Sequence, residues 1–531
     1  MEKRTAFATL SRFRAEFYEC LNGRGDALFE LAGALLCTEG PVRTLVDLAL
    51  APEHRRGHGA LYGGLNNGRL GVARLRRTLA GLPLPKAADG RLVLAADVSP
   101  WLRPDAATAP DRSFCHTYGR GEGRHQMIPG WPYSVVAALE TGRTSWTAPL
   151  DAISLGPGAD VAAVTTAQIH DLVERLIAAG QWTDGDPYVL IVLDAGYDAP
   201  RIAHLLEGLP VEILGRMRSD RVLRRPIPPR VYDPKGGRPP KHGGEFVFGD
   251  PDTWGTEQAV TVTDTRLYGK ATARAWDRLH PRLTRRAAWL DHDGPLPLIE
   301  GTVIRLRVER LPSGGENKPV WLWWSRTGAT RADIDRCWQS FLRRFDLEHT
   351  FRMIKQTLGW TKPRQRSPQA ADRWTWLVVA AHTQLRLARP LAADLRRPWE
   401  KPAEPNRLTP ARVRRGLRNL RAKMASQRVH PNLPAPAPGA HRAPRTVVRQ
   451  RVKKSDASSP PVRHAPARPT TRRAPSHGAR GRKAFPPTDR VPACRRVGYS
   501  APAAARTCSP SMITGSFADT ATAATSPPKP L

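Results

Sequence analysis

The sequence predicts an α/β fold: a mixed sheet flanked by helices, with a helical N-terminal domain, a β-rich insertion and a disordered basic C-terminal tail. Two observations support this. Between residues 91 and 217, apolar segments of strand length alternate with amphipathic helical segments. Beyond about residue 430, Pro, Arg, Ala, Ser and Thr dominate without apolar periodicity, so no packed core is expected there. A length of 531 residues suits two or three domains.

The first part of the chain has the pattern of amphipathic helices. Apolar residues recur at spacings of three and four between residues 8 and 80, as in Phe13, Phe17 and Leu21. Glycine-rich stretches such as LYGGLNNGRLG separate the helical segments. We therefore expect a helical domain over residues 1–85.

The next part of the chain alternates strands and helices. RLVLAADVS, PYSVVAALE and SWTAPLDAISL are predicted strands, with a hairpin turn at residues 141–143 between the last two. A helix from Val161, the strand YVLIVLDAG, a helix around residues 201–207 and the strand VEILGRM follow. The helices supply the crossovers that parallel strands need. This order matches the ribonuclease H-like fold, whose first part is expected at residues 86–218.

A stretch with a different pattern interrupts that fold. Residues 219–330 are rich in Pro and Gly and contain β-like runs such as GTVIRLRVERL and PVWLWWS, which predict a β-rich insertion subdomain. Residues 331–425 return to helical patterns and form the second part of the ribonuclease H-like domain. Residues 426–531 are the expected disordered basic tail.

The charge balance favours a polyanionic partner, because 83 Lys and Arg face 48 Asp and Glu, a formal charge of +35. Residues 401–531 hold 27 basic and 4 acidic residues, or +23, which leaves +12 for residues 1–400. The six cysteines lack the spacing of a zinc site or a disulfide scaffold. No apolar leader opens the chain and no apolar run is long enough to span a bilayer. We expect a cytoplasmic protein without membrane association.

Two aspartates follow apolar strands and are candidates for metal binding. Asp97 is expected at the end of the first strand, in LAADVS, and Asp194 at the end of the fourth, in VLIVLDAG. The predicted strand order makes these strands neighbours, and two close carboxylates repel unless a cation lies between them. Magnesium takes oxygen ligands, and a third carboxylate would complete a two-metal site for phosphodiester displacement.

The helix predicted over RRFDLEHTFRMIKQTLGW supplies that third carboxylate. On an ideal helix Phe341, Arg344 and Lys355 each lie within about 40° of Glu348. Apolar residues flank this stripe, so its charges need partners. We expect Glu348 to bind metal and Arg344 and Lys355 to contact phosphate; an exposed basic edge, or an Arg344–Glu348 pair, is the alternative. Asp346 lies about 200° from Glu348 and is the poorer ligand candidate.

Other residues are candidates for DNA contacts or for structural roles. Arg216 and Arg218, just after the fifth strand, are expected to neutralise backbone phosphates. Arg238, in YDPKGGRPPKHGG, loosely resembles a hook for the minor groove, although a flexible basic loop fits equally well. Asp198 is expected to cap the helix that follows it.

The charged helix also carries a recognisable motif. An aromatic residue, two residues, Arg, three residues, Glu, six residues and Lys resemble the signature of one large group of bacterial insertion-sequence transposases of the DDE type. In this chain the pattern reads Phe341, Arg344, Glu348 and Lys355. The family has tyrosine at the first position. The DAGYD context of Asp194 and the run FDLEHTFRMIKQTLGW are similar to the DDE superfamily endonucleases, and the resemblance covers roughly residues 10–425.

The resemblance implies a DNA transposase that hydrolyses phosphodiesters at transposon ends and joins the 3′ ends to target DNA. It implies a triad of Asp97, Asp194 and Glu348 that binds Mg²⁺, with Mn²⁺ as a substitute, and a β-rich insertion within the gap of 154 positions from Asp194 to Glu348. It also implies that the helical N-terminal domain binds double-stranded DNA, that a homodimer forms the synaptic complex, and that the protein is associated with the nucleoid. Trp323 is then a core residue or stacks on a displaced base. The alternative is an inactive transposase-derived DNA-binding protein, against which the presence of all three carboxylates argues.

Overall fold

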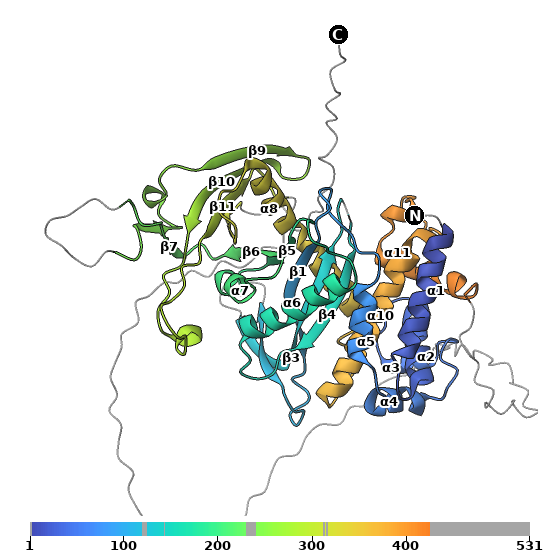
Figure 1. Cartoon of the computed structure of the whole chain (residues 1–531). Helices are drawn as coiled ribbons and strands as arrows, with labels where there is room; N and C mark the ends of the chain where they lie inside the picture. The colour runs from blue at the N-terminus through green and yellow to red at the C-terminus, as the bar shows by residue number, and fades with distance from the viewer. Residues whose placement is uncertain are drawn as a thin grey trace, which may run out of the picture. The chain divides into compact units, whose positions relative to one another are not determined.

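The structure is a computed structural model and describes residues 3–118, 125–142, 144–229, 240–311, 314 and 317–424. It contains a large mixed sheet flanked by helices (Figure 1), as the sequence predicts. The predicted tail over residues 426–531 and the predicted hook residue Arg238 lie outside the described residues. None of the described helices is both long and apolar enough to cross a bilayer.

The central sheet has ten strands, in the order β2-β3-β1-β5-β6-β12-β11-β10-β9, with β4 paired to β3. Its first six strands in the chain are β1 (Val93–Leu102), β2 (Ser113–Tyr118), β3 (His125–Leu139), β4 (Thr147–Ser154), β5 (Val189–Leu193) and β6 (Val211–Met217). The strands β1, β5 and β6 are parallel, whereas β1, β3 and β4 pair antiparallel. The predicted neighbourhood of the first and fourth strands, now β1 and β5, is therefore confirmed. The sequence did not predict the edge strand β2.

The strands that follow β6 extend the same sheet. The short strands β7 (Val222–Arg224) and β8 (Glu245–Val247) form a separate pair. The others are β9 (Ala259–Thr265), β10 (Gly269–Leu279), β11 (Gly301–Val308) and β12 (Val320–Trp324). Because β12 pairs antiparallel with β6, the strands of the predicted insertion continue the central sheet.

The pairing register divides side chains between the two faces of the sheet. One row of paired residues consists of Ala96, Leu193, Gly215, Trp323, Val303 and Trp276. Asp97 follows Ala96, and since side chains alternate along a strand, its side chain points to the opposite face. We call that face of the sheet the Asp97 face.

Helices cover both faces, and hydrogen bonds show which covers which. Helices α6 (Val161–Ala178) and α7 (Ala199–Leu205) lie on the face opposite Asp97, where Ser134 donates a hydrogen bond of 2.7 Å to Gln168 of α6. Helix α8 (Arg331–Arg343) lies on the Asp97 face, since its Asp335 accepts a 2.7 Å hydrogen bond from Thr261.

Local sequence signals set where these helices begin. The carboxylate of Asp198 accepts a hydrogen bond from the backbone of Arg201, so the predicted cap of α7 is confirmed. Thr330 and Asp333 form a capping box at the start of α8. Gly215 of β6 lets α7 approach closely, because a Cβ there would lie 2.3 Å from the Cβ of Ala199. Glycine is therefore required at this crossing.

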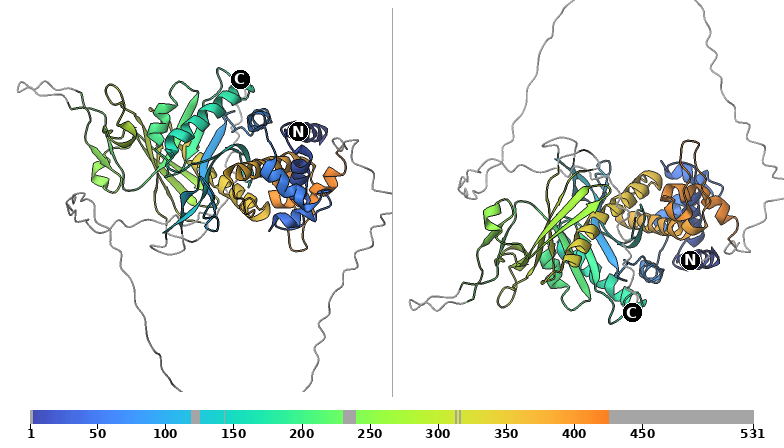
Figure 2. Two further views of the ribbon diagram at one scale, coloured as in Figure 1. Left: turned by 90° about the horizontal axis from the view of Figure 1, so that it is seen from below. Right: turned by 90° about the horizontal axis from the view of Figure 1, so that it is seen from above.

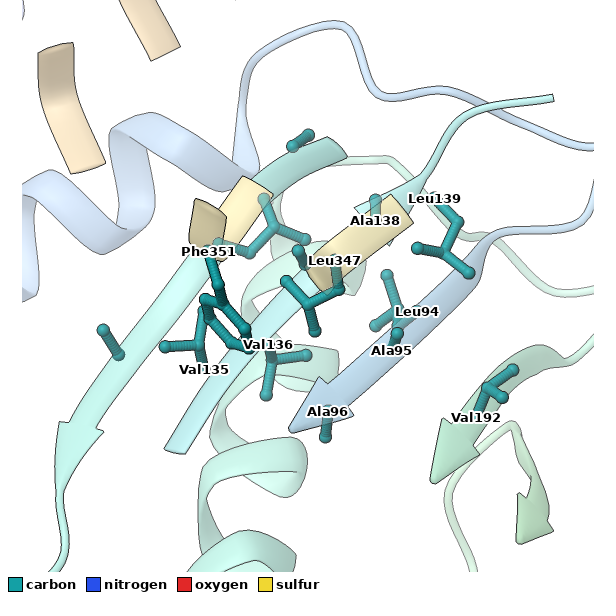
Figure 3. Close-up of a cluster of buried hydrophobic side chains, with 14 of the residues drawn as sticks. Leu94, Ala95, Ala96, Val135, Val136, Ala138, Leu139, Val192, Leu347 and Phe351 are labelled. Carbon is teal, nitrogen blue, oxygen red and sulfur yellow. The ribbon is translucent and has the colours of Figure 1, made fainter. Parts of the chain in front are cut away.

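Helix α9 (Phe345–Arg352) is fixed on the Asp97 face by its apolar side chains. Figure 3 shows Leu347 and Phe351 over Val135 and Val136 of β3, beside the β1 residues 94–96. Leu347 is fully buried and Phe351 nearly so. Burial of two large apolar side chains contributes roughly 3 to 6 kcal/mol, which anchors the helix that carries Glu348.

The remaining helices form a second layer from both ends of the described chain. They are α1 (Lys3–Glu19), α2 (Gly25–Cys37), α3 (Leu45–Ala49), α4 (His58–Asn67), α5 (Val72–Ala80), α10 (Pro368–Ala388) and α11 (Pro410–Arg421). Helix α10 packs against α1, α2, α4 and α11. Figures 1 and 2 show the N-terminal blue helices beside the orange ones. Arg414 of α11 donates to the carbonyl of Leu35 in the last turn of α2, so α11 satisfies carbonyls that the helix leaves free.

His382 in the middle of α10 makes stability depend on pH. It is fully buried, and burial together with the positive charge of Arg386 lowers its pKa to about 3. Its ring thus stays neutral in the folded protein, but in the unfolded chain it takes up a proton below about pH 6.5. Above pH 6.5 the neutral ring of His382 does not reduce the free energy of unfolding. Below pH 6.5 protonation stabilises the unfolded chain, so the free energy of unfolding decreases as the pH falls. From pH 7.5 to 5.5, urea unfolding should show the wild type losing about 1.4 kcal/mol more than His382→Leu. Equal losses would contradict this.

Candidate active site

Two aspartates lie side by side at the centre of the Asp97 face. Ala96 of β1 pairs with Leu193 of β5 in parallel register, so the next residues, Asp97 and Asp194, point to the same side. Asp194 directly follows the end of β5, as expected. The expectation that Asp97 ends its strand is wrong, because β1 continues to Leu102 through antiparallel pairing with β3. Five further residues of β1, paired with β3, therefore follow Asp97 in the sheet.

The predicted glutamate helix is present but is not straight. Helix α8 ends at Arg343 and α9 begins at Phe345. The intervening Arg344 donates its backbone N–H to Phe341, a tighter turn than in an α-helix. After α9, the residues Met353–Thr357 form a π-helical turn, η3. The ideal 100° spacing used for the sequence prediction therefore does not hold across this segment. Such π turns occur often at functional sites.

Arg344 lies between the three predicted metal ligands. Its Nη1 is 2.8 Å from Oδ2 of Asp97, and its Nη2 is 3.2 Å from Oδ2 of Asp194 and 3.2 Å from Oε1 of Glu348. The pair with Glu348, one of the alternatives raised by the four-residue spacing, is thus present. The structure brings Asp97, Asp194 and Glu348 around one guanidinium group, and Arg344 contacts carboxylates where the sequence predicted a phosphate contact.

Burial distinguishes the arginine from the acids around it. The Arg344 side chain is 2% exposed, whereas those of Asp97 and Glu348 are 20% and 46% exposed. The guanidinium carbon is 5.8 Å from the ring centre of Phe341 and 5.3 Å from that of Phe345. Arg344 is thus held beneath the carboxylates by aromatic rings, which attract a cation.

The electrostatics of the site reflect crowded like charges. Burial, together with the charges of Asp194 and Glu348, raises the pKa of Asp97 to about 6 despite the opposing effect of Arg344. Burial and the charge of Asp194 also raise the pKa of Glu348. Burial acts to raise the pKa of Asp194, but Arg344 and Arg216 outweigh it and hold that pKa below its usual value. Three carboxylates face two guanidinium groups, so additional positive charge would stabilise the site.

The donor set fits a hard divalent cation. All three acids offer carboxylate oxygens, the ligands that magnesium prefers. Oδ1 of Asp194 is buried and accepts no hydrogen bond from the described residues; the nearest cationic nitrogen, Nη1 of Arg216, is 3.5 Å away. Arg344 lies between the three acids, and their oxygens are not all within 4.8 Å of one another. Among the described residues, a group that close consists of the half-buried His170 and the exposed Asp171 and Glu174 of α6.

Lys355 lies in the π-helical turn, beside the site. Its Nζ is 5.7 Å from the ring centre of Trp360. Burial lowers its pKa to about 8, against the effect of the negative charge of Asp97. The site thus places a half-buried ammonium group near Asp97, where it is not part of the Arg344 network.

The other predicted DNA contacts lie in different surroundings. Arg216 on β6 pairs with Asp194 at 3.5 Å, which places it at the edge of the acidic site. Arg218 is exposed, and its Nε donates to Asp220 at 3.1 Å. Trp323 is fully buried and donates to the carbonyl of Leu279, so it packs as a core residue in this structure.

One residue near the site was missed by the sequence analysis. Tyr197 is nearly buried, and its pKa is raised by burial and then by the charge of Asp97. Its hydroxyl is thus within the electrostatic reach of the acids and stays protonated. Tyr197 belongs to the DAGYD segment, in which the sequence analysis considered only Asp194 and Asp198.

Comparison with known proteins agrees with this geometry. A family model described as DDE superfamily endonuclease matches residues 16–282. The matched part contains Asp97 and Asp194, whereas Glu348 lies outside it. A search of curated proteins found no match to the chain.

Proposed function

Since the chain belongs to the family of DDE superfamily endonucleases, we propose that it is a DNA transposase that cuts transposon ends and joins their 3′ ends to target DNA. Nucleases of this family generally use divalent metal ions. The observation that supports the proposal most directly is the convergence of Asp97, Asp194 and Glu348 on Arg344. Because two ends must be joined, we propose a homodimer as the acting form and an insertion sequence as the source of the ends.

Asp97, Asp194 and Glu348 would hold the metal, with Mg²⁺ as the proposed ion and Mn²⁺ as a substitute. The bound ions supply Lewis-acid stabilisation of the charge that develops on the phosphate oxygens. Oδ1 of Asp194, which lacks a hydrogen-bond donor among the described residues, is the first free ligand for them.

The basic residues of the site have roles that follow from their positions. Arg344 keeps the three carboxylates together against their mutual repulsion while no metal is bound. Lys355, half-buried and outside that network, is positioned to neutralise a phosphate of the DNA. Arg216 joins Asp194 to the edge of the site and orients that carboxylate.

A cleavage and joining assay tests the proposal. Labelled DNA carrying the inverted repeats that flank the gene is incubated with the full chain and Mg²⁺, and a supercoiled plasmid is added as target. We expect free 3′ ends and their joined products with the wild type, and DNA binding without cutting with Glu348→Gln. If the wild type binds these ends but never cuts them, the DNA-binding alternative is the better description.

The pKa of Lys355 predicts a pH dependence of DNA binding. With a pKa of about 8, the ammonium group is charged below that pH and neutral above it. A phosphate contact made by Lys355 should therefore weaken as the pH rises from 7 to 9, by a factor of about 10 if that contact is lost. Arginine keeps its charge over this range, so Lys355→Arg should bind a DNA duplex with the same affinity at both pH values. Fluorescence anisotropy in EDTA measures the affinity of the wild type and of Lys355→Arg for the duplex at each pH. If the two affinities change with pH by the same factor, Lys355 does not make this contact.

A further inference from the structure

The segment between Glu348 and helix α10 is exclusively basic among its charged residues. From residue 349 to residue 371 the sequence has no Asp or Glu and five Lys or Arg. The last three of these, Lys362, Arg364 and Arg366, are exposed, whereas the intervening Pro363 and Gln365 are buried. We call the three exposed residues the basic strip. Their alternation points all three cations to solvent from one side of the segment.

The backbone under the basic strip is fixed to the fold. Arg103, which is almost fully buried, donates from Nη1 to the carbonyl of Gln365 and forms a 3.0 Å ion pair with Asp105. Directly after the strip, the side chain of Ser367 caps α10 by accepting from the backbone of Ala370. The backbone of the basic strip is therefore held in place at both Gln365 and Ser367, and this fixes the positions from which the three cationic side chains extend.

The charges of the basic strip are barely compensated. Arg364 is 87% exposed, and its nearest carboxylate, Asp105, is 4.0 Å away and half-exposed. In the described part of the chain, Lys362 and Arg366 have no acidic partner within 4.0 Å. Elsewhere many arginines are paired: Arg412 and Arg415 of α11, for example, bind Asp394 and Glu400. The positive charges of the basic strip are therefore largely not neutralised within the fold and can attract an external anion.

The basic strip lies along the same face of the sheet as the acids. Trp101 is four residues beyond Asp97 on β1, so both side chains point to the Asp97 face. The ring centre of Trp360 lies 6.2 Å from that of Trp101, and the Nζ of Lys355, which the charge of Asp97 influences, lies 5.7 Å from the Trp360 ring centre. The chain then passes from Trp360 into the strip within two residues. Lys355 and the basic strip thus lie on either side of Trp360 in the sequence.

We propose that the basic strip binds the phosphate backbone of the DNA substrate beside the cleavage position, which rests on the proposed function. Arg103, which anchors the strip, is six residues along the strand direction from Asp97, or about 20 Å. At about 3.4 Å per nucleotide, the contacts lie roughly six base pairs from the cleaved phosphate. The strip therefore holds the backbone irrespective of base sequence.

The salt dependence of DNA binding tests this proposal independently of cleavage. The full chain and its triple variant Lys362→Gln, Arg364→Gln, Arg366→Gln are titrated onto a 30-base-pair duplex of mixed sequence, in EDTA, at salt concentrations from 50 to 300 mM. Loss of three phosphate contacts should reduce the slope of log K against log salt by about 2.7 and weaken binding at 0.1 M salt on the order of 10²-fold.

A matched control removes the same charge from the opposite face. Lys270, Arg274 and Arg307 are exposed, and the register places them on the face away from Asp97. Changing these three residues to glutamine should leave the slope close to that of the wild type. Since all six side chains are exposed, both variants should unfold at the wild-type temperature, which excludes misfolding as the cause of a difference.

The outcomes separate the basic strip from the proposed function. Equal slopes for the two triple variants would overturn the strip proposal, as would loss of binding to vesicles of anionic phospholipid without any loss on the duplex. If the wild type binds the duplex through the basic strip but never cuts the element's ends, the proposal for the strip is supported and the proposed transposase activity is contradicted.

Discussion

Replacing Glu348 with glutamine should lower the rate of DNA cleavage by about 10³-fold or more, equivalent to about 4 kcal/mol of transition-state stabilisation. The amide keeps the size of the side chain but removes the charge that a divalent cation needs. Asp97→Asn and Asp194→Asn should have effects of the same order, because the three acids act on one site. Single-turnover cleavage of labelled ends measures the rate, and calorimetry with Mn²⁺ measures the metal affinity.

Asp346 provides a control on the same helix. It is a buried carboxylate whose pKa is raised to about 7 by burial, against the opposing effect of Arg343, and its carboxylate is not among those that Arg344 pairs with. Asp346→Asn should leave both cleavage and Mn²⁺ affinity within a few-fold of the wild type. Loss of Mn²⁺ binding in this variant, or its retention in Asp194→Asn, would mean that the wrong acids have been assigned.

Replacing Arg344 with glutamine should destabilise the metal-free protein by about 3 to 5 kcal/mol, the usual cost of breaking a buried ion pair. The lower end of this range is expected, since the carboxylates remain partly exposed. Without Arg344, the three acids repel one another, and Arg216 contacts Asp194 at the longer distance of 3.5 Å. Urea unfolding in EDTA measures the loss. Adding 10 mM Mn²⁺ should restore much of it, because the metal then supplies the missing positive charge.

Arg216→Gln is the matched comparison for Arg344→Gln. Arg216 is 34% exposed and contacts one acid at 3.5 Å, so its loss should cost less than about 1 kcal/mol. If Arg344→Gln were as stable as Arg216→Gln in EDTA, repulsion among the acids would be negligible. Arg344 would then not be the group that keeps them together.

The sequence predicted those parts of the fold that depend on local patterns. Strands such as VLIVLDAG are recognisable because they are buried on both faces and therefore continuously apolar. The adjacency of β1 and β5 was predicted from the order of strands and crossover helices, which matches the ribonuclease H-like fold. The edge strand β2 was missed because SFCHTY mixes polar and apolar residues without the strict alternation of a half-buried strand.

The details of the candidate site were less accessible from sequence. The helical wheel assumes 100° per residue, but the tight turn at Arg344 and the π turn after Arg352 change that angle. Whether Arg344 contacts a phosphate or a carboxylate depends on its burial beneath the sheet edge, which spacing alone does not encode. Similarly, the charge count over residues 401–531 does not show that Arg412 and Arg415 bind carboxylates within the fold.

The position of α10 has a consequence for the order in which the protein matures. The apolar surfaces of α1 and α2 are covered by a helix that begins at Pro368, more than 300 residues later in the chain. While a ribosome is still translating the central strands, those surfaces have no native partner and are exposed to chaperones or to other nascent chains. The helical layer is complete only after α11 has left the ribosome tunnel, so the sheet can assemble well before the rest of the molecule.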